Sequence, residues 1–483
     1  MTTSPKPSDL IGGFRIENCS HVGGNGYIYR VAPPPGIDPP FPLMMKMPGV
    51  GRGEPPLGVV SFEIEWTILP RLSGPFVPQV VAVGELDVHP FIVMEEIVGE
   101  GLTQIVECAP LPIDQVAAIG AAIADALHSI HQQEVIHFDL KPENVILRAN
   151  GEAVLLDFGF ARHAHYPDLL AEQLTFAAGS AAYVSPEQLQ KDRSDSRSDL
   201  FALGVLLFQL ATGELPFGEP ETYAGMRDRL WRAPAPPRSV RPEVPPWLQE
   251  VILRCLERYP ARRYQTAAHI AFDLRHPDQV PLTKRAELRA GASMGRQLWR
   301  WWRSLGHAID VSSPRGKRPD LSSVILVAVD TEHPEDRRHA ALQEATRAIV
   351  SLHADFRLMF VSVIRAAELG EGARIEDTAS GKHLEHRKRL RRWVEPLGLT
   401  PIRTSLHVIM SDDPAATLLE LAHANHVDLI VLGAPGPSQR AFAWWRSAAS
   451  TITANAACSV YVVRAVAEAV EAALENEGSE SLD

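Results

Sequence analysis

The chain has 483 residues, of which 45% are hydrophobic, and a formal net charge of −12 at pH 7. It is too long for one ordinary domain of roughly 100–200 residues, and its hydrophobic content is sufficient for packed cores, which excludes a globally disordered protein. The negative charge argues against nonspecific binding of nucleic acid as the main role.

Residues 1–9 predict a flexible tail. The N-terminus has neither the basic start nor the apolar core that would predict a secretory signal. The longest apolar run, residues 200–211, is shorter than the roughly 18 residues that span a bilayer and predicts a buried helix. The four cysteines are scattered without metal-type pairing, which is typical of reduced thiols. We therefore expect a soluble, cytoplasmic protein.

A glycine cluster, with Gly23, Gly24 and Gly26, follows the first strand-like stretch. Glycine lets backbone amides approach a phosphate closely, although an ordinary hairpin turn has the same composition. Residues 43–46 then predict a strand, and residues 62–72 carry apolar side chains at the spacing of one helix face. Two further strands and a long amphipathic helix lead to the next polar loop.

Residues 135–160 bring acidic, amide and basic side chains close together. Asp139, Lys141 and Asn144 lie on a short loop, and an apolar strand then leads to Asp157. Phosphoryl transfer from a nucleotide requires such a set. Asp139 would be the base for the acceptor hydroxyl, and Lys141 would steady the γ-phosphate. Asn144 and Asp157 would hold divalent metal ions.

The order and spacing of these residues resemble the catalytic loop and metal-binding motif of the eukaryotic-like Ser/Thr protein kinases. This resemblance implies an α+β bilobal kinase fold, ATP as the phosphoryl donor, Mg²⁺ as the metal, and protein Ser or Thr hydroxyls as acceptors. It extends over residues 10–277, with an N-terminal lobe at 10–95 and a C-terminal lobe at 96–277.

The resemblance also assigns nucleotide-binding roles upstream. Gly23 and Gly26 occupy the second and third positions of the family's glycine-rich loop, and His21 stands where the first glycine is expected. Lys46 falls where the family's ATP-anchoring lysine lies. By position alone, Met94 is assigned as the gatekeeper, and the adenine-binding hinge is formed by Glu95, Glu96 and Ile97.

The expected ion-pair partner of Lys46 is Glu65, because helical spacing places it beside the apolar face of its helix. Glu63 is the rival, but it points to another side of that helix. Two structural contacts are implied as well. Asp199 would bind backbone amides of the catalytic loop, and Glu187 would pair with Arg263.

Phe138 departs from the family, most of whose members have arginine there. That arginine pairs with a phosphate on the activation segment, which corresponds to residues 160–184 here, and phenylalanine cannot do this. The sequence therefore predicts activity that is independent of phosphorylation of this segment, unless another basic residue such as Arg162 substitutes. Ser180 on the substrate-side loop, together with Lys141, is typical of kinases that act on Ser or Thr.

Residues 278–320 are rich in arginine and tryptophan. They predict a basic linker helix whose tryptophan face packs on one of the domains. The alternative is a helix that lies on an anionic membrane surface, which no lipid-anchor motif supports.

From residue 321, short apolar runs alternate with helices, which predicts an α/β doubly wound parallel sheet. The strands are predicted at residues 324–329, 358–364, 405–409, 429–432 and 460–463. The helices are predicted near residues 335–353, 382–394, 414–425 and 447–456. This pattern resembles the universal stress protein family over residues 321–466, and an acidic tail follows at 467–483.

Asp330, Gly433 and Gly436 match the nucleotide-site positions of that family, and Ser447 would lie at the N-terminus of the last helix, where backbone amides accept phosphate. The ATP-binding members have glycine before this hydroxyl residue, whereas this chain has Arg446. Nucleotide binding and a dimerising or regulatory module both stay open.

The sequence predicts a multidomain Ser/Thr protein kinase in stress signalling, with a regulatory universal-stress-protein-like domain. The alternative is a catalytically weak nucleotide-binding scaffold or sensor, which His21 and Phe138 would favour. The expected partners are protein substrates and a second copy of the chain through the C-terminal domain, with no role for nucleic acid.

Overall fold

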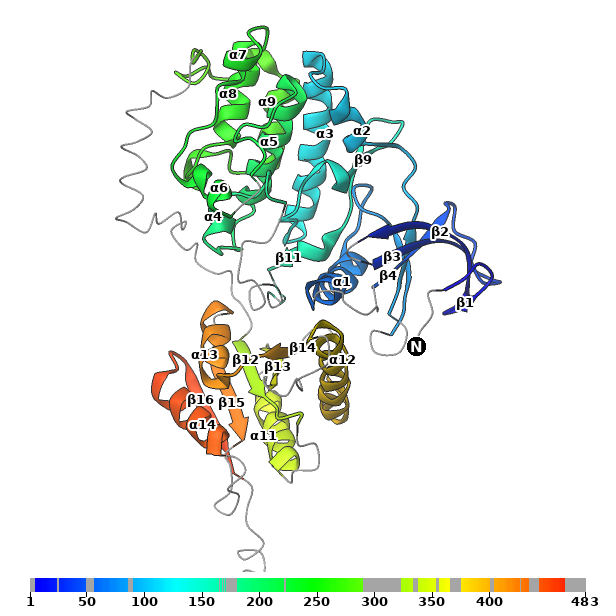
Figure 1. Ribbon diagram of the computed structural model, residues 1–483, viewed down its shortest axis with the longest axis vertical. Coiled ribbons are helices and arrows are strands. Elements are labelled where there is room, and N and C mark those ends of the chain that lie inside the picture. Colours follow the sequence, from blue (N-terminus) through cyan, green and yellow to red (C-terminus); the bar gives the residue numbers. More distant parts are fainter. Residues whose placement is uncertain are drawn as a thin grey trace, which may run out of the picture. The chain divides into compact units, whose positions relative to one another are not determined.

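A computed structural model of the protein falls into two compact units, Met1–Lys317 and Arg318–Asp483 (Figure 1). It describes residues 5–23, 26–48, 56–85, 90–164, 166, 168, 170, 180–220, 223–289, 323–332, 338–352, 356–364, 375–399, 404–425, 427–433 and 443–464. Most of the expected connector and the acidic tail therefore lie outside the described residues.

The first unit begins with an antiparallel sheet of six strands in the order β1-β2-β3-β4-β6-β5. These are β1 (Leu10–Ile11), β2 (Phe14–Gly23), β3 (Gly26–Ala32), β4 (Leu43–Met47), β5 (Val80–Val83) and β6 (Ile92–Glu95). Alternate side chains such as Phe14 and Ile16 on β2, and Tyr29 and Val31 on β3, form an apolar cluster on one face. The helix α1 (Pro56–Ile68) lies between β4 and β5 in the chain and contributes Phe62 to a larger core.

Helices make up most of the remainder of this unit (Figure 1). They are α2 (Leu102–Glu107), α3 (Ile113–Gln132), α4 (Pro186–Leu189), α5 (Arg197–Thr212), α6 (Tyr223–Met226), α7 (Pro237–Val240), α8 (Pro246–Cys255) and α9 (Ala267–Arg275). The central helix α5 packs on α3 and α8 and is buried on nearly all sides. This confirms the buried helix predicted at residues 200–211.

Short strands flank the polar loop that lies between α3 and α4. They are β7 (Glu100–Gly101), β8 (Val135–Ile136), β9 (Val145–Leu147), β10 (Ala153–Leu155) and β11 (Arg162–His163). The antiparallel pair of β9 and β10 separates Asn144 from Asp157 in the chain and returns them to the same end of the hairpin. The turn η3 (Phe158–Phe160) then follows Asp157.

Within the described part of the chain, α3 alone has the length and apolar composition of a membrane span. Half of its apolar window is buried inside the protein. Its side chains Val116, Ile123, Leu127 and Ile130 lie in the core against α5 and α9. The apolar character of α3 thus has a sufficient explanation in the packing of this unit.

Part of the expected connector is held on the surface of α8. The Glu250 carboxylate accepts hydrogen bonds from the backbone amides of Thr283 and Ala286 at 3.0 and 3.2 Å. Arg285 pairs with Glu250 and Glu257 at 3.0 and 2.8 Å. The described residues 280–289 contain turns rather than the predicted linker helix, and they extend the packed region beyond the expected border at 277.

The second unit contains a parallel sheet of five strands in the order β14-β13-β12-β15-β16. These are β12 (Ser323–Ala328), β13 (Phe356–Ile364), β14 (Thr404–Met410), β15 (Leu429–Gly433) and β16 (Ser459–Val463). All four strand pairs are parallel, which confirms the predicted parallel sheet.

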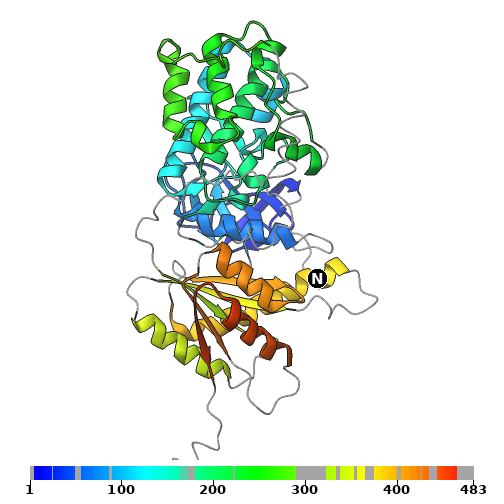
Figure 2. The same cartoon turned by 90° about the vertical axis from the view of Figure 1, so that its left-hand side faces the viewer.

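Helices cover both faces of this sheet (Figure 2). One core contains residues of α11 (Arg338–Leu352) and α12 (Ile375–Val394), and the other contains residues of α13 (Pro414–Ala424) and α14 (Ala443–Asn455). Alternate residues of β12 supply the two cores, because successive side chains of a strand point to opposite faces. Two helices begin earlier than predicted, because their first turns lack the apolar spacing that marks the rest.

Candidate active site

Lys46, on β4, lies between two acidic side chains. Its Nζ is in contact with Glu65 on α1, and it lies 3.1 Å from Oδ1 of Asp157. The exposed fractions of Lys46 and Glu65 are 8% and 2%. Burial alone would lower the pKa of Lys46, but the charges of Asp157 and Glu65 raise it, so that the ammonium group stays protonated. The structure thus places Glu65, rather than Glu63, against Lys46.

Asp157 adopts a left-handed conformation, with φ of 58°, that a non-glycine residue seldom adopts. Its carboxylate accepts a hydrogen bond from the amide of Gly159 at 3.4 Å. Burial would raise the pKa of Asp157, but Lys46 lowers it below its ordinary value. A Cβ atom at Gly159 would lie 3.0 Å from Cβ of Ser61, so glycine lets α1 approach this turn closely.

The carboxylate of Asp139 is the centre of a second polar cluster. The backbone amide and the hydroxyl of Ser180 donate to its Oδ1 at 2.9 and 3.0 Å. Its Oδ2 lies 3.1 Å from Nζ of Lys141 and accepts from Nδ2 of Asn144 at 3.2 Å. These contacts fix the orientation of a carboxylate that is almost completely buried.

Asp199, at the start of α5, supports the backbone of the same loop from below. Its two carboxylate oxygens accept hydrogen bonds from the amides of His137 and Phe138, each at 2.9 Å. His131 contacts it at 2.8 Å. The predicted role of Asp199 is therefore confirmed. The Glu187–Arg263 pair is also present, with two contacts at 2.6 and 2.8 Å.

We expect Asp199→Asn to lower the free energy of unfolding of the first unit by about 2–3 kcal/mol at neutral pH, because one amide oxygen replaces two charged acceptors. Burial would raise the pKa of Asp199, but its bond with His131 and the nearby amides lower it. Its stabilisation is therefore present above its ordinary pKa of about 4 and is lost as the pH falls below that value.

Urea unfolding at neutral and acid pH tests this expectation. The control is Asp125→Asn, which removes a half-exposed pair with Arg275 and should change stability by no more than about 0.5 kcal/mol. An Asp199→Asn protein as stable as wild type at neutral pH, or a deficit that persists undiminished in acid, would contradict the role of this carboxylate.

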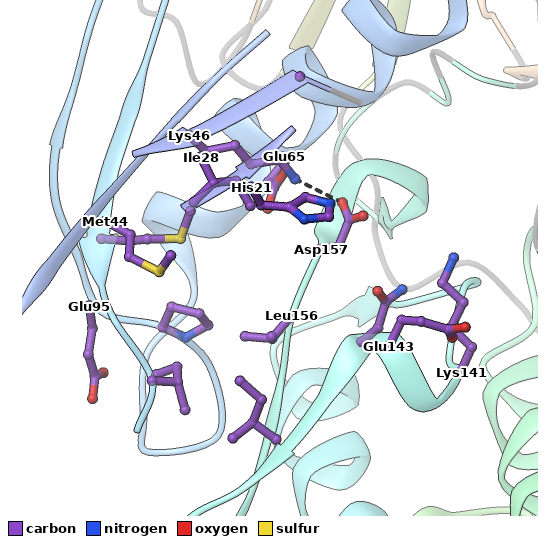
Figure 3. Close-up of a pocket in the computed structure, with 16 residues that line it drawn as sticks. His21, Ile28, Met44, Lys46, Glu65, Glu95, Lys141, Glu143, Leu156 and Asp157 are labelled. Carbon is purple, nitrogen blue, oxygen red and sulfur yellow. Dashed lines mark hydrogen bonds and ion pairs between the residues drawn. The ribbon is translucent and has the colours of Figure 1, made fainter. Parts of the chain in front are cut away.

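A pocket of about 430 Å³ opens beside the two polar clusters (Figure 3). Figure 3 shows Lys46, Glu65 and His21 near Asp157, with Lys141 and Glu143 further along the same side. The predicted site residues that line this pocket are Gly26, Lys46, Glu65, Met94, Glu95, Ile97, Lys141, Asn144 and Asp157. Asp139 is not among the lining residues, but its carboxylate contacts two that are, Lys141 and Asn144.

Besides Met94 and Ile97, further apolar residues line the pocket that were not identified from the sequence. They are Ile28, Met44, Pro78, Ile146 and Leu156. The strand pattern could have indicated two of these residues. Side chains two residues apart on a strand point to the same face, and each residue lies opposite a partner on the neighbouring strand. Met44 is two residues from Lys46 on β4, and Ile28 on β3 is paired with Lys46.

Two of the three hinge amides are already used within the protein. The amides of Glu95 and Glu96 donate to the carbonyls of Gln79 and Pro42 at 2.9 and 2.8 Å. Ile97 is therefore the hinge residue whose amide best suits a ligand in the pocket.

The glycine-rich turn is described in part. Gly23 pairs with Gly26 across β2 and β3, and Gly26 has φ of 128°, which favours glycine. Gly24 lies outside the described residues. His21, at the missing first glycine position, lines the pocket near Asp157 (Figure 3).

In the second unit, Asp330 follows one strand, and Gly433 ends the strand beside it. Asp330 comes two residues after β12, and Gly433 is the last residue of β15, which pairs with β12. The carboxylate of Asp330 accepts from the amide of Glu332 at 3.0 Å. Gly436 lies outside the described residues. Ser447 is the fifth residue of α14, so the expectation that it begins this helix is wrong. Its amide is not one of the four unpaired amides at the helix start.

Both units match known protein families. Residues 60–273 match the protein kinase domain model, and residues 323–464 match the universal stress protein family. The kinase match begins within α1, so the glycine-rich turn and Lys46 are placed by the structure rather than by this match.

Bacterial relatives resemble the first unit. The probable serine/threonine-protein kinase CPE1738 of Clostridium perfringens is 34% identical over 217 residues, which cover 45% of this chain and 31% of the relative. PknB of Mycolicibacterium smegmatis is 35% identical over 44% of this chain and 35% of its own length. PknL of Mycobacterium tuberculosis is 30% identical over 277 residues, covering 56% of this chain and 68% of the relative. The chain spans about a third of the length of the first curated relatives it matches.

Proposed function

Since the chain belongs to the serine/threonine protein kinase family and also carries a universal stress protein domain, we propose that it transfers the γ-phosphoryl group of ATP to Ser or Thr hydroxyls of proteins. The observation that carries this proposal is the convergence on one pocket of Lys46, paired with Glu65, and of Asn144 and Asp157 from the opposite side. A scaffold that only binds nucleotide would not need this complete set.

Each group has a defined task in this proposal. The buried ammonium group of Lys46, fixed by Glu65, would bind the α- and β-phosphates. Asp139 would orient the acceptor hydroxyl and accept its proton, with its carboxylate fixed by Ser180 and Asn144. Lys141, 3.1 Å from Asp139, would stabilise charge on the transferred phosphoryl group.

Kinases of this family use ATP with a divalent metal ion, and we propose Mg²⁺ here. Within the described residues, no group of three or more His, Cys, Asp or Glu side chains is arranged around a metal position. This fits Mg²⁺ in a nucleotide site, which usually takes one or two protein ligands and completes its coordination with phosphate oxygens and water. Asn144 and Asp157 would be those ligands, and the metal would neutralise phosphate charge. The lowered pKa of Asp157 suits it to this role.

Transfer of label from γ-labelled ATP to casein, used as a generic acceptor protein, tests this function. We expect acid-stable label on Ser and Thr when Mg²⁺ is present, and none after chelation of divalent metal. Bound ATP with no transferred label in the presence of Mg²⁺ or Mn²⁺ would favour the scaffold instead.

For the second unit we propose a regulatory nucleotide site. Asp330 and Gly433 support it, because they lie at the carboxyl ends of adjacent parallel strands where the strand order reverses, which is where doubly wound sheets bind ligands. We also propose that this unit mediates self-association, and that the protein acts in stress signalling in the cytoplasm.

Equilibrium dialysis of the full chain against ATP measures this second site. We expect two ATP molecules per chain, falling to one in the Asp330→Ala variant. A single ATP in both proteins would leave the second unit as a module that does not bind nucleotide.

A further inference from the structure

Arg193 contacts the catalytic loop and two positions of the activation segment. Its Nε pairs with Oδ2 of Asp168 at 2.7 Å, and its Nη2 donates to the carbonyl of Phe160 at 2.7 Å. Its guanidinium carbon lies 4.5 Å from the centroid of the Phe138 ring. Phe138 precedes Asp139, Phe160 ends the turn after the metal-binding aspartate, and Asp168 lies further along the activation segment. One side chain therefore links both halves of the catalytic apparatus to that segment.

These three side chains are buried together. The exposed fractions of Arg193, Asp168 and Phe138 are 5%, 7% and 3%. Burying an ion pair is costly unless its geometry is good. Nη1 of Arg193 is buried without a hydrogen-bond partner among the described residues, so the contacts of the other two guanidinium nitrogens and of the ring must offset this cost. A planar guanidinium suits this place, because it can pair with a carboxylate, donate to a carbonyl and stack on an aromatic ring at once.

The position of Arg193 is fixed from its backbone as well. Its carbonyl accepts a hydrogen bond from Arg162 at 2.6 Å. Phe138 has a left-handed φ of 60°, and its carbonyl accepts from Gln188 at 2.9 Å. Hydrogen bonds to their backbone carbonyls therefore hold both Arg193 and Phe138 in place. Movement of either residue would disturb the stacked contact.

We propose that Arg193, Asp168 and Phe138 form a permanent clamp that holds Phe160 and Asp168 of the activation segment on the catalytic loop without a phosphate group. A phosphorylation switch supplies its negative charge only after modification. Asp168 supplies that charge constantly, from a residue of the chain itself. The inference rests on the proposed kinase function and gives its regulation. Arg193 is a positioning residue, since it acts through Phe138 and Asp168 and does not line the ATP pocket.

Steady-state kinetics of label transfer to casein test the clamp in the full chain. We expect Arg193→Met and Asp168→Asn each to lower kcat by about 30-fold, because each breaks the buried ion pair between the two side chains. KM for ATP should change by no more than about twofold, since the nucleotide pocket is not touched. The conservative Arg193→Lys keeps the charge without the planar group and should recover part of kcat. Phosphatase treatment should leave the rate of the wild-type protein unchanged.

A matched control lies four residues further along the chain, at the start of α5. Arg197 pairs with Asp195 at 2.6 Å and donates a hydrogen bond to Gln265 at 2.6 Å. Arg197→Met should therefore keep kcat within about twofold of wild type, as expected of a substitution outside the catalytic apparatus. Wild-type kcat in Arg193→Met, or a wild-type protein that loses its activity on phosphatase treatment, would overturn the clamp.

The double variant Asp168→Asn/Arg193→Met separates positioning from folding. Removal of both charges should restore most of the unfolding stability lost in either single variant, because neither charge of the ion pair is then buried without the other. Its kcat should stay low, because the segment is still not held. Recovery of kcat together with stability would show that the pair has only a structural role.

Amide hydrogen exchange tests whether the clamp exists, independently of catalysis. In Arg193→Met, the amides of residues 158–163 should exchange at least about tenfold faster than in wild type. A wild-type protein that binds ATP but transfers no label would remove the proposed function, and this exchange difference would still support the clamp. Equal exchange in both proteins would overturn it.

Discussion

Replacement of Asp139 by asparagine should lower kcat for phosphoryl transfer by about a thousandfold, the effect expected from loss of a general base. Asparagine can still accept hydrogen bonds from Ser180, so the local backbone should be preserved. It cannot accept the proton of the acceptor hydroxyl. Because Asp139 does not line the ATP pocket, ATP affinity should remain within about twofold of wild type.

Initial rates and ATP titrations on the same preparations check this prediction. The control Asp125→Asn makes the same chemical change at a half-exposed pair with Arg275 and should retain the full rate. Equal losses of rate and of ATP affinity in Asp139→Asn would place this residue in nucleotide binding. An unchanged rate would remove it from the chemistry altogether.

Replacement of Lys46 by methionine should lower kcat/KM for ATP by about 100- to 1,000-fold, the usual effect of removing one preorganised electrostatic contact. The variant leaves Glu65 and Asp157 close together without a cation. Lys46 holds the pKa of Asp157 down, so in the variant that pKa should rise. The loss should therefore be greater in mildly acidic than in mildly alkaline buffer, because a protonated Asp157 binds metal poorly.

A pH series of kcat/KM for wild type, Lys46→Met and Glu65→Gln provides the comparison. Glu65→Gln leaves Lys46 its contact with Asp157 at 3.1 Å and should lose less activity than Lys46→Met. A loss in Lys46→Met that is the same at every pH would contradict the proposed coupling between Lys46 and Asp157.

The sequence was sufficient for those parts of the site that depend on local spacing. Asp139, Asn144 and Asp157 lie on one loop and hairpin, so their separation in the chain determines their separation in space. Helical spacing likewise favoured Glu65 over Glu63, and Glu65 contacts Lys46 in the structure. The five strands of the second unit begin and end within two residues of their predicted positions, because their apolar runs are short and clearly bounded.

Features that depend on contacts between distant segments were not predictable. No local pattern indicates that Arg193 stacks on Phe138, or that residues 280–289 are bound by α8. A basic stretch has the same composition whether it forms a free helix or is held by acidic side chains. The start of α14 was misplaced because the residues before Ser447 have no helical apolar spacing, although the tertiary structure makes them helical.

The catalytic role of Asp157 is tested by measuring phosphoryl transfer and ATP binding in the same samples of wild type and Asp157→Ala. We expect labelled casein with wild type, almost none with Asp157→Ala, and ATP bound by both proteins when Mg²⁺ is present. Equal transfer by the two proteins would contradict the claim that this carboxylate, opposite Lys46, completes a catalytic site.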